Sequence, residues 1–293
     1  MLSRTVYSFI IDGAPIFAYQ GYILAKSIIA HCHANPGDIY IHFSSGVSED
    51  VRAIFRDIGV NILCFEPFGD RKYCNKIVQL PALAKLDFGK LILLDTDTIV
   101  VEDLASQFDD SAILGKIVDC CNPSIQCLEA IFDDAGIDAP SILLTDTEDG
   151  ATFLGNFNGG LYVVPKRFAP LLGEAWRAWA EFLLSDNKRL EAEGKTNHVD
   201  QVSFAMACSS INAPVKAISS NFNFFTHFEA QRHYYNPQLP VFMLHYHNNG
   251  LDHNGFIKFS HVRHHAGLYG IEKANDFIAR LSNRSPLLRC LSN

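Results

Sequence analysis

The sequence of 293 residues lacks the long apolar runs that membrane insertion requires. It has no stretch of about 18 uncharged apolar residues, so no transmembrane segment is expected. The chain reaches Asp12 before any long apolar region develops, so no signal peptide is expected either. The eight cysteines form no CxxC pair, which argues against a zinc ribbon or a thioredoxin-like site. Free thiols and a cytoplasmic location are therefore expected.

The chain also lacks an excess of positive charge. Its 24 Lys and Arg residues face 32 Asp and Glu residues, for a formal net charge of −8. Binding to a nucleic-acid backbone needs a basic stripe, so no nucleic-acid partner is expected. Neither GxGxxG nor GxxxxGK[ST] occurs, which excludes a standard NAD domain and a P-loop enzyme.

Short apolar runs alternate with helical patterns along the chain. This alternation implies right-handed βαβ crossovers and a parallel sheet in the first hundred residues. The second half is more mixed, so we expect one compact α/β unit with a mixed, mostly parallel sheet flanked by helices. Strands are predicted at 5–11, 38–44, 60–68, 90–101, 112–119, 159–165, 214–220 and 240–247. Helices are predicted at 19–33, 48–59, 73–89, 168–185, 198–211 and 271–282, with a kink or restart at Pro81.

Two aspartates interrupt the predicted strand at 90–101. Asp95 and Asp97 are two residues apart, so on an extended backbone their side chains point the same way. Two carboxylates cannot stay ionised in a buried sheet, so they must lie at its carboxyl edge, where open α/β sheets bind ligands. Like charges at that spacing are costly unless a cation shares them, and oxygen ligands suit Mg²⁺ or Mn²⁺. The alternative is a strand end with solvated Asp caps.

The segment LILLDTDTIVVEDL at 91–104 resembles the DxD segment of GT-A glycosyltransferases. It is most similar to the retaining family 8, which includes glycogenin and bacterial lipooligosaccharide galactosyltransferases. Further motifs follow in the order of that family, so the resemblance extends over residues from about 5 to 260. They are Asn158 and Gly160 in NFNGGLYVVPK, Asp200 and Gln201 in HVDQVSFAMA, and His245 in VFMLHYH.

The resemblance implies a GT-A fold and a bound cation. The glycosyltransferase domain would span 1–270, with a nucleotide-binding half at 1–104, a sugar and acceptor half at 105–270, and a C-terminal helix and tail at 271–293. Mn²⁺, or Mg²⁺, would be held by Asp95, Asp97 and His245. From the residues alone, His245, His247 and His253 stay open as the third ligand, because His245 and His247 face the same way on a strand.

The resemblance also implies contacts to a nucleotide-sugar donor. Asp200 would orient the donor sugar, Gln201 would lie near the anomeric carbon, and Asn158 would contact the sugar. Their structural alternatives are a helix-capping Asp200 and an Asn-Gly turn at Asn158. Donor-binding residues complete the set: Asp12, Lys76, Asp95, Thr96, Asp97, Gly160 and Lys258.

Two parts of the sequence depart from the family pattern. The family continues its late histidine as H-x-x-G-x-x-K-P-W. Here His247 to Gly250 fits the first part without the lysine, whereas His253 to Lys258 fits the end but is one residue short, and Phe259 stands in place of Pro. The family has Asp-x-x-Tyr after the first strand, whereas Pro15 occupies that position here, so Tyr19 or Tyr22 would have to stack on a base. Lys76 could also be a surface lysine.

The predicted function is transfer of a hexose from a nucleoside-diphosphate sugar, expected to be a UDP-sugar, to a carbohydrate or glycoconjugate acceptor, with retention implied by the resemblance. One alternative is an NDP-sugar nucleotidyltransferase, which would need a basic, Gly-rich loop after the first strand. The other is a non-catalytic protein that binds nucleotide or glycan. The donor sugar, the acceptor and the oligomeric state do not follow from the sequence.

Overall fold

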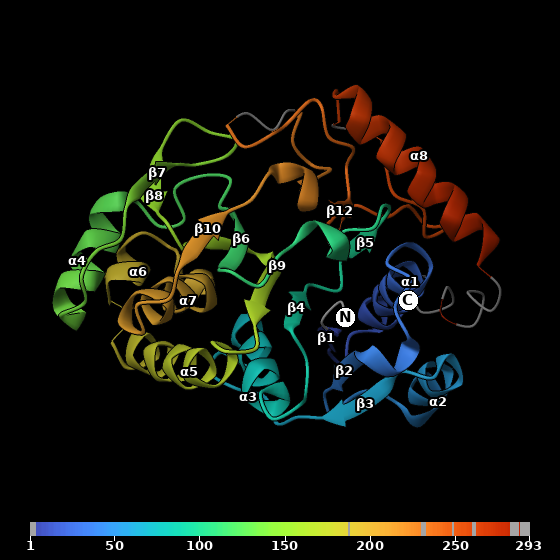
Figure 1. The fold of residues 1–293 in the computed structure, drawn as a ribbon, viewed down its shortest axis with the longest axis horizontal. Helices are drawn as coiled ribbons and strands as arrows, with labels where there is room; N and C mark the ends of the chain where they lie inside the picture. Colours follow the sequence, from blue (N-terminus) through green and yellow to red (C-terminus); the bar gives the residue numbers. More distant parts are fainter. Residues whose placement is uncertain are drawn as a thin grey trace.

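The structure is a computed structural model that describes residues 4–186, 188–229, 233–247, 249–259, 262–281 and 287. Its centre is a seven-stranded sheet in the order β10-β6-β9-β4-β1-β2-β3 (Figure 1). Strand β9 runs antiparallel to β4 and β6, and the other neighbours are parallel. The strands are β1 Thr5–Ile11, β2 Ile39–Phe43, β3 Asn61–Cys64, β4 Lys90–Leu94, β6 Ile113–Ile117, β9 Phe157–Pro165 and β10 Val215–Ala217. This arrangement confirms the predicted mixed, mostly parallel sheet.

Two smaller sheets accompany the central one. A three-stranded sheet has the order β11-β12-β5, and a two-stranded hairpin joins β7 to β8. Their bounds are β5 Thr98–Val100, β11 Phe224–Phe225, β12 Met243–His245, β7 Ile142–Leu144 and β8 Ala151–Phe153. The hairpin, β11 and helix α4 were not predicted from the sequence pattern.

The helices divide into two groups around the sheet. In Figure 1, α4, α5, α6 and α7 gather on the left, whereas α1, α2 and α8 lie on the right. The α-helices are α1 Pro15–His31, α2 Glu49–Ile58, α3 Gln79–Leu83, α4 Ile125–Ala135, α5 Ala169–Ser185, α6 Lys188–Ala192, α7 Val199–Ser210 and α8 His265–Arg280. The 3₁₀-helices are η1 Pro36–Asp38, η2 Tyr73–Val78, η3 Ala105–Gln107, η4 Thr196–His198 and η5 Ser220–Phe222. Among the described residues, no helix is both long and apolar enough to cross a bilayer.

Both faces of the sheet are buried, which explains the unbroken apolar run before the acidic pair. Along β4, Ile92 and Leu94 belong to one hydrophobic core, whereas Leu91 and Leu93 belong to the other. Alternate residues of a strand point to opposite faces, so a strand covered on both sides favours apolar residues along its length. The two carboxylates without buried partners of their own are therefore expected beyond the end of β4.

Three local predictions were wrong. The strand predicted at 90–101 ends at Leu94, and Asp95 and Asp97 lie in a turn to β5, which belongs to a different sheet. The helix predicted at 73–89 is a 3₁₀-helix, η2, followed by the short α3, with Pro81 in the first turn of α3, where proline is tolerated. The strand predicted at 240–247 is limited to β12, and His247 has a left-handed backbone with φ 56°.

Candidate active site

The acidic turn after β4 brings two carboxylates to the carboxyl edge of the sheet. The backbone N–H of Asp95 donates to Gly160 O at 3.3 Å, which ties the turn to β9. The carbonyl of Asp97 accepts from Tyr246 N at 3.0 Å, which ties its other end to the segment after β12. The turn is therefore held between two strands that are distant in sequence.

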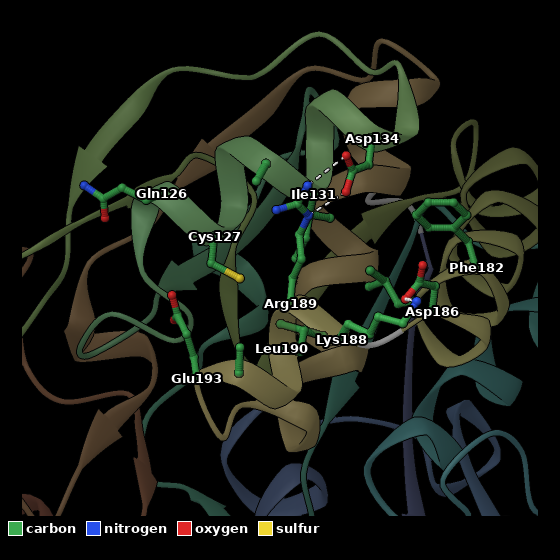
Figure 2. Close-up of a pocket in the computed structure, with 13 residues that line it drawn as sticks. Gln126, Cys127, Ile131, Asp134, Phe182, Asp186, Lys188, Arg189, Leu190 and Glu193 are labelled. Carbon is green, nitrogen blue, oxygen red and sulfur yellow. Dashed lines mark hydrogen bonds and ion pairs between the residues drawn. The ribbon is translucent and has the colours of Figure 1, made fainter.

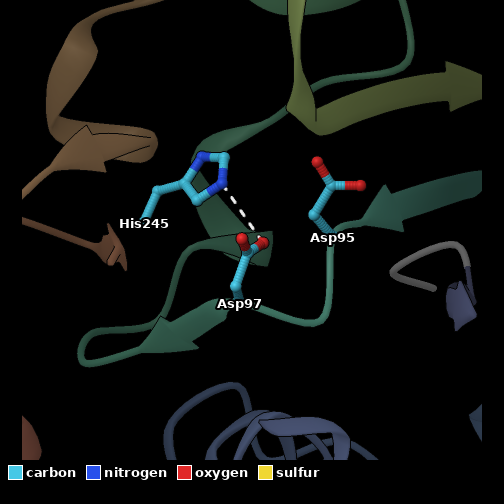
Figure 3. A group of neighbouring side chains, drawn as sticks. All are labelled: Asp95, Asp97 and His245. Carbon is cyan, nitrogen blue, oxygen red and sulfur yellow. Dashed lines mark ion pairs between the residues drawn. The ribbon is translucent and has the colours of Figure 1, made fainter. Parts of the chain in front are cut away.

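His245 reaches this turn because β12 pairs antiparallel with β5, with His245 opposite Thr98. Figure 3 shows its imidazole above Asp97, and Nε2 lies 3.2 Å from Asp97 Oδ1. One ligand atom from each of Asp95, Asp97 and His245 lies within 4.8 Å of the others. Burial alone would raise the pKa of Asp97, but the neighbouring His245 outweighs it and holds that pKa at about 2. Asp97 is therefore ionised at neutral pH.

The three candidate histidines occupy different environments. His245 is almost fully buried beside Asp97, and the His247 ring stacks on it with centroids 4.0 Å apart. The two rings lie side by side because of the left-handed backbone of His247, and not because both residues belong to one extended strand. His253 is exposed, and its Nε2 lies 3.1 Å from Asn254 Nδ2, away from the acidic turn. Of the three, His245 alone belongs to the group of possible ligands among the described residues.

Lys76 is part of the site and is not a surface lysine. Its Nζ lies 2.7 Å from Asp95 Oδ1 and 3.6 Å from Asp200 Oδ2, and it donates to Gly159 O at 3.0 Å. Burial disfavours the charged amine, but the two carboxylates outweigh burial and raise the Lys76 pKa. A Cβ at Gly159 would lie 2.2 Å from Lys76 Nζ, so the glycine makes room for this ammonium group.

Asp200 faces Lys76 from the first turn of α7. The N-cap position belongs to His198, and no side chain caps the helix, so the capping interpretation of Asp200 is wrong. Its side chain is 3% exposed, and Oδ1 is buried without a hydrogen-bond partner. Burial raises the Asp200 pKa to about 7, although Lys76 opposes the shift. A buried carboxylate without full pairing is costly, which is typical of a functional position.

A pocket of about 740 Å³ joins these groups. Gln201, Asn158 and Lys258 also line it, and Lys258 Nζ donates to Asn249 O at 2.8 Å. Several other lining residues were not predicted, because they lie outside the motifs or beside the motif positions and reach the pocket only through the fold. These are Tyr73, Asp119, Asn122, His198, Thr226, His227, Tyr246, Asn249 and Gly250.

A smaller pocket of about 240 Å³ adjoins the first and shares Tyr73, Lys76, Asp95 and Asp97 with it. Asp12 and Thr96 line the smaller pocket. Asp12 accepts from Gly13 N at 2.8 Å and from Asn75 Nδ2 at 3.2 Å. Asp12, which follows β1, and Thr96, in the acidic turn, were both predicted to bind the donor, and they line the same pocket.

The prediction that Tyr19 or Tyr22 stacks on a base was wrong, because both rings are buried in the core. The phenol of Tyr19 donates to Gly255 O at 3.1 Å. Tyr73 lines both pockets instead and is 42% exposed, with Lys72 Nζ 4.8 Å from its ring centroid. The sequence signal for Tyr73 was only its position at the start of the segment that also carries Lys76.

Another pocket, of about 830 Å³, lies among α4, α5 and α6 (Figure 2). Arg189 and Asp134 form an ion pair at this pocket, and Cys127 points its sulfur toward it. No residue predicted to bind donor or cation lines it. The larger volume of this pocket therefore does not make it the candidate active site.

Comparison with known families decides the class of the protein. The family described as the Rhodobacterales glycosyltransferase domain matches residues 8–212, which include the acidic turn, Lys76 and Asp200. The chain belongs to this family. It is therefore a glycosyltransferase, which confirms the resemblance of the DxD segment. A search of curated proteins found no match.

Solved glycosyltransferases share the fold of this family member. The galactosyltransferase LgtC, in complex with donor and acceptor sugar analogues, has a TM-score of 0.54 at 19% identity and covers 94% of this chain and 96% of its own. The bifunctional WbbM has a TM-score of 0.55 at 14% identity over 100% of this chain. GlyE of Streptococcus pneumoniae TIGR4 has a TM-score of 0.52 at 14% identity over 98% of this chain. The chain spans about half of WbbM, 52%, and 63% of GlyE.

Proposed function

We propose that this glycosyltransferase transfers a hexose from a UDP-sugar to a carbohydrate or glycoconjugate acceptor, in a reaction that depends on Mn²⁺ or Mg²⁺. The observation that carries the proposal is the convergence of Asp95, Asp97 and His245 beside Lys76 and Asp200 in one pocket. Three carboxylates against one lysine leave a local excess of negative charge. A site of this kind suits a cation that is itself shared with a diphosphate.

The donor atoms fit a divalent cation with mixed ligands. Two carboxylate oxygens and an imidazole nitrogen suit Mn²⁺ better than Mg²⁺, which accepts nitrogen less readily. When bound, such a cation neutralises the negative charge that develops on a departing diphosphate. Lys76, which holds Asp95 at 2.7 Å, adds a second positive charge at the same place. We propose that Lys258, which also lines the larger pocket, contacts the diphosphate.

The two adjoining pockets suggest how the donor lies. We propose that the nucleoside occupies the smaller pocket, where Asp12 accepts hydrogen bonds from the base or ribose, Thr96 lines the wall and Tyr73 supplies the stacking ring. The diphosphate then lies at the acidic turn, where the two pockets meet. The hexose extends into the larger pocket.

In that placement the hexose lies among Asp200, Gln201 and Asn158. The carboxylate of Asp200 would orient sugar hydroxyl groups, and Gln201 would support positive charge near the anomeric carbon without forming a covalent bond, because an amide is a poor nucleophile. Gly160 lies against the His245 ring, where a Cβ would lie 2.6 Å from Nδ1, so the absence of a side chain leaves room for the imidazole. Retention of configuration is proposed from the resemblance to family 8.

We also propose that the protein is cytoplasmic and binds no nucleic acid. The seven described cysteines are free thiols, which supports a reducing compartment. The acidic balance of the chain, with a formal charge of −8, supports the absence of a nucleic-acid partner.

Release of UDP from UDP-glucose and UDP-galactose, with and without Mn²⁺, tests the proposal. A hexosyltransferase should release UDP with at least one donor, by transfer or slow hydrolysis, and only with the cation. A nucleotidyltransferase would instead release pyrophosphate from a nucleoside triphosphate and a sugar 1-phosphate. A non-catalytic binding protein would bind the donors without releasing UDP, and either result would refute the proposed reaction.

A further inference from the structure

We propose that Asn223 is a positioning residue for the cation site, where it holds His245 so that Nε2 faces the acidic turn. The inference rests on the proposed function, because it assumes that His245 binds the cation. Asn223 follows η5 and precedes β11, and it is fully buried. It belongs to none of the motifs that identified the other site residues.

Hydrogen-bond logic fixes the orientation of this group. The backbone N–H of Gly160 donates to Asn158 at 2.9 Å, and because a backbone N–H can only donate, the accepting atom is the amide oxygen Oδ1. The same oxygen lies 2.9 Å from Asn223, so the Asn223 atom that faces it must be the donor Nδ2. The other end of the Asn223 amide, Oδ1, therefore faces His245.

That orientation determines which imidazole nitrogen is available. His245 Nδ1 lies 3.1 Å from Asn223 Oδ1, which can only accept, so Nδ1 carries the hydrogen and donates it. Nε2, 3.2 Å from Asp97 Oδ1, is then the nitrogen that faces the acidic turn, where a bound cation would take the place of a hydrogen between the two atoms. Histidines that bind metals usually donate their other ring N–H to such a partner, which fixes both tautomer and ring orientation.

Gly160 supports the same interpretation independently. A Cβ at this position would lie 2.6 Å from His245 Nδ1 and 2.9 Å from Asn223 Nδ2. Any side chain there would separate the two partners. The Asn-x-Gly sequence in β9 therefore has a role in the structure beyond sugar contact: Asn158 orients Asn223, and Gly160 leaves room for the bond to His245.

Mn²⁺ affinity, measured by electron paramagnetic resonance with saturating UDP, tests the role without relying on activity. Asn223→Leu keeps the approximate size but removes both hydrogen bonds, and it should weaken Mn²⁺ binding about 10- to 100-fold. Asn223→Asp keeps an acceptor for His245 Nδ1 but loses the donor to Asn158 Oδ1, so it should weaken Mn²⁺ binding clearly less than Asn223→Leu does. Asn61→Leu, in β3 at the far edge of the sheet, removes a donor to Gly37 O and should leave Mn²⁺ affinity unchanged.

Two results would overturn the positioning role: wild-type Mn²⁺ affinity in Asn223→Leu, or an equal loss in Asn223→Asp and Asn223→Leu. If Asn223→Leu does not fold, Gly160→Ala provides the test, because it displaces the same pair and should also weaken Mn²⁺ binding. Unchanged affinity in Gly160→Ala would then refute the inference. A wild-type protein that binds no Mn²⁺ would refute the proposed function itself, together with this inference, and is readily distinguished from a failure of Asn223 alone.

Discussion

Replacing Asp200 with asparagine should slow sugar transfer and, at the same time, stabilise the folded chain above pH 7. Asn keeps the size of the side chain and removes its charge. If the carboxylate acts mainly in the transition state, turnover should fall by roughly 10²-fold while UDP affinity stays the same. The expected gain in stability follows from the burial of Asp200 beside Lys76.

The sign of the stability change follows from the raised pKa. Folding raises the Asp200 pKa from 3.8 to about 7, so the folded state binds the proton more tightly than the unfolded state. The ionised carboxylate therefore destabilises the fold increasingly as pH rises from 4 to 7. Because one pKa unit corresponds to about 1.36 kcal/mol, the full effect is about 4 kcal/mol above pH 7 and about 1 kcal/mol at pH 4.5. These are upper bounds, since Lys76 loses one of its two partners in the variant.

Urea denaturation of the wild type and Asp200→Asn at pH 4.5 and pH 8 checks this expectation. The variant should gain stability at pH 8 and little at pH 4.5. Asp276→Asn, an exposed position on α8, should show no such pH-dependent gain. Equal stability of Asp200→Asn and wild type at pH 8, or wild-type turnover in the variant, would contradict the assignment of Asp200 as a strained functional carboxylate.

Three further changes have defined outcomes. Tyr73→Ala should weaken UDP binding about tenfold and Tyr73→Phe should not, if the ring stacks on the base; equal calorimetric affinities for all three proteins would exclude stacking. Lys116 and Asp146 form a fully buried ion pair at 3.0 Å, so Lys116→Met should lower the free energy of unfolding by ~3–5 kcal/mol, and an unchanged denaturation midpoint would contradict this. His245→Ala should weaken Mn²⁺ binding while His253→Ala leaves it unchanged; equal losses would show that the late histidines are misassigned.

Much of the fold could be predicted from local patterns. The apolar run at 91–94 indicates a strand covered on both faces, and this alone is enough to place Asp95 and Asp97 at the sheet edge. The backbone conformation of Asp95 and Asp97 could not be predicted, because a short polar interruption of an apolar run is compatible both with a turn and with a continuing strand. The period of the hydrophobic residues does not show where one sheet ends and another begins.

The residues that escaped prediction act through contacts between distant parts of the chain. Asn223 matters because η5 and β11 place it between Asn158 and His245, 65 and 22 residues away in the sequence. Tyr73 contributes to both pockets because η2 brings it to the wall that the two pockets share with Lys76, Asp95 and Asp97. Nothing in the composition near either residue indicates these contacts. Packing between elements, which a single sequence specifies only collectively, produces them.

Calorimetric titration of UDP in the presence and absence of Mn²⁺ tests the central claim most directly, that the acidic turn holds the cation through which the donor diphosphate is bound. The wild type should bind UDP tightly only with Mn²⁺. Asp97→Ala should lose the Mn²⁺-dependent part of the affinity while remaining folded, because Asp97 lies in a turn at the sheet edge and not in either hydrophobic core. Unchanged Mn²⁺-dependent affinity in folded Asp97→Ala would contradict the account.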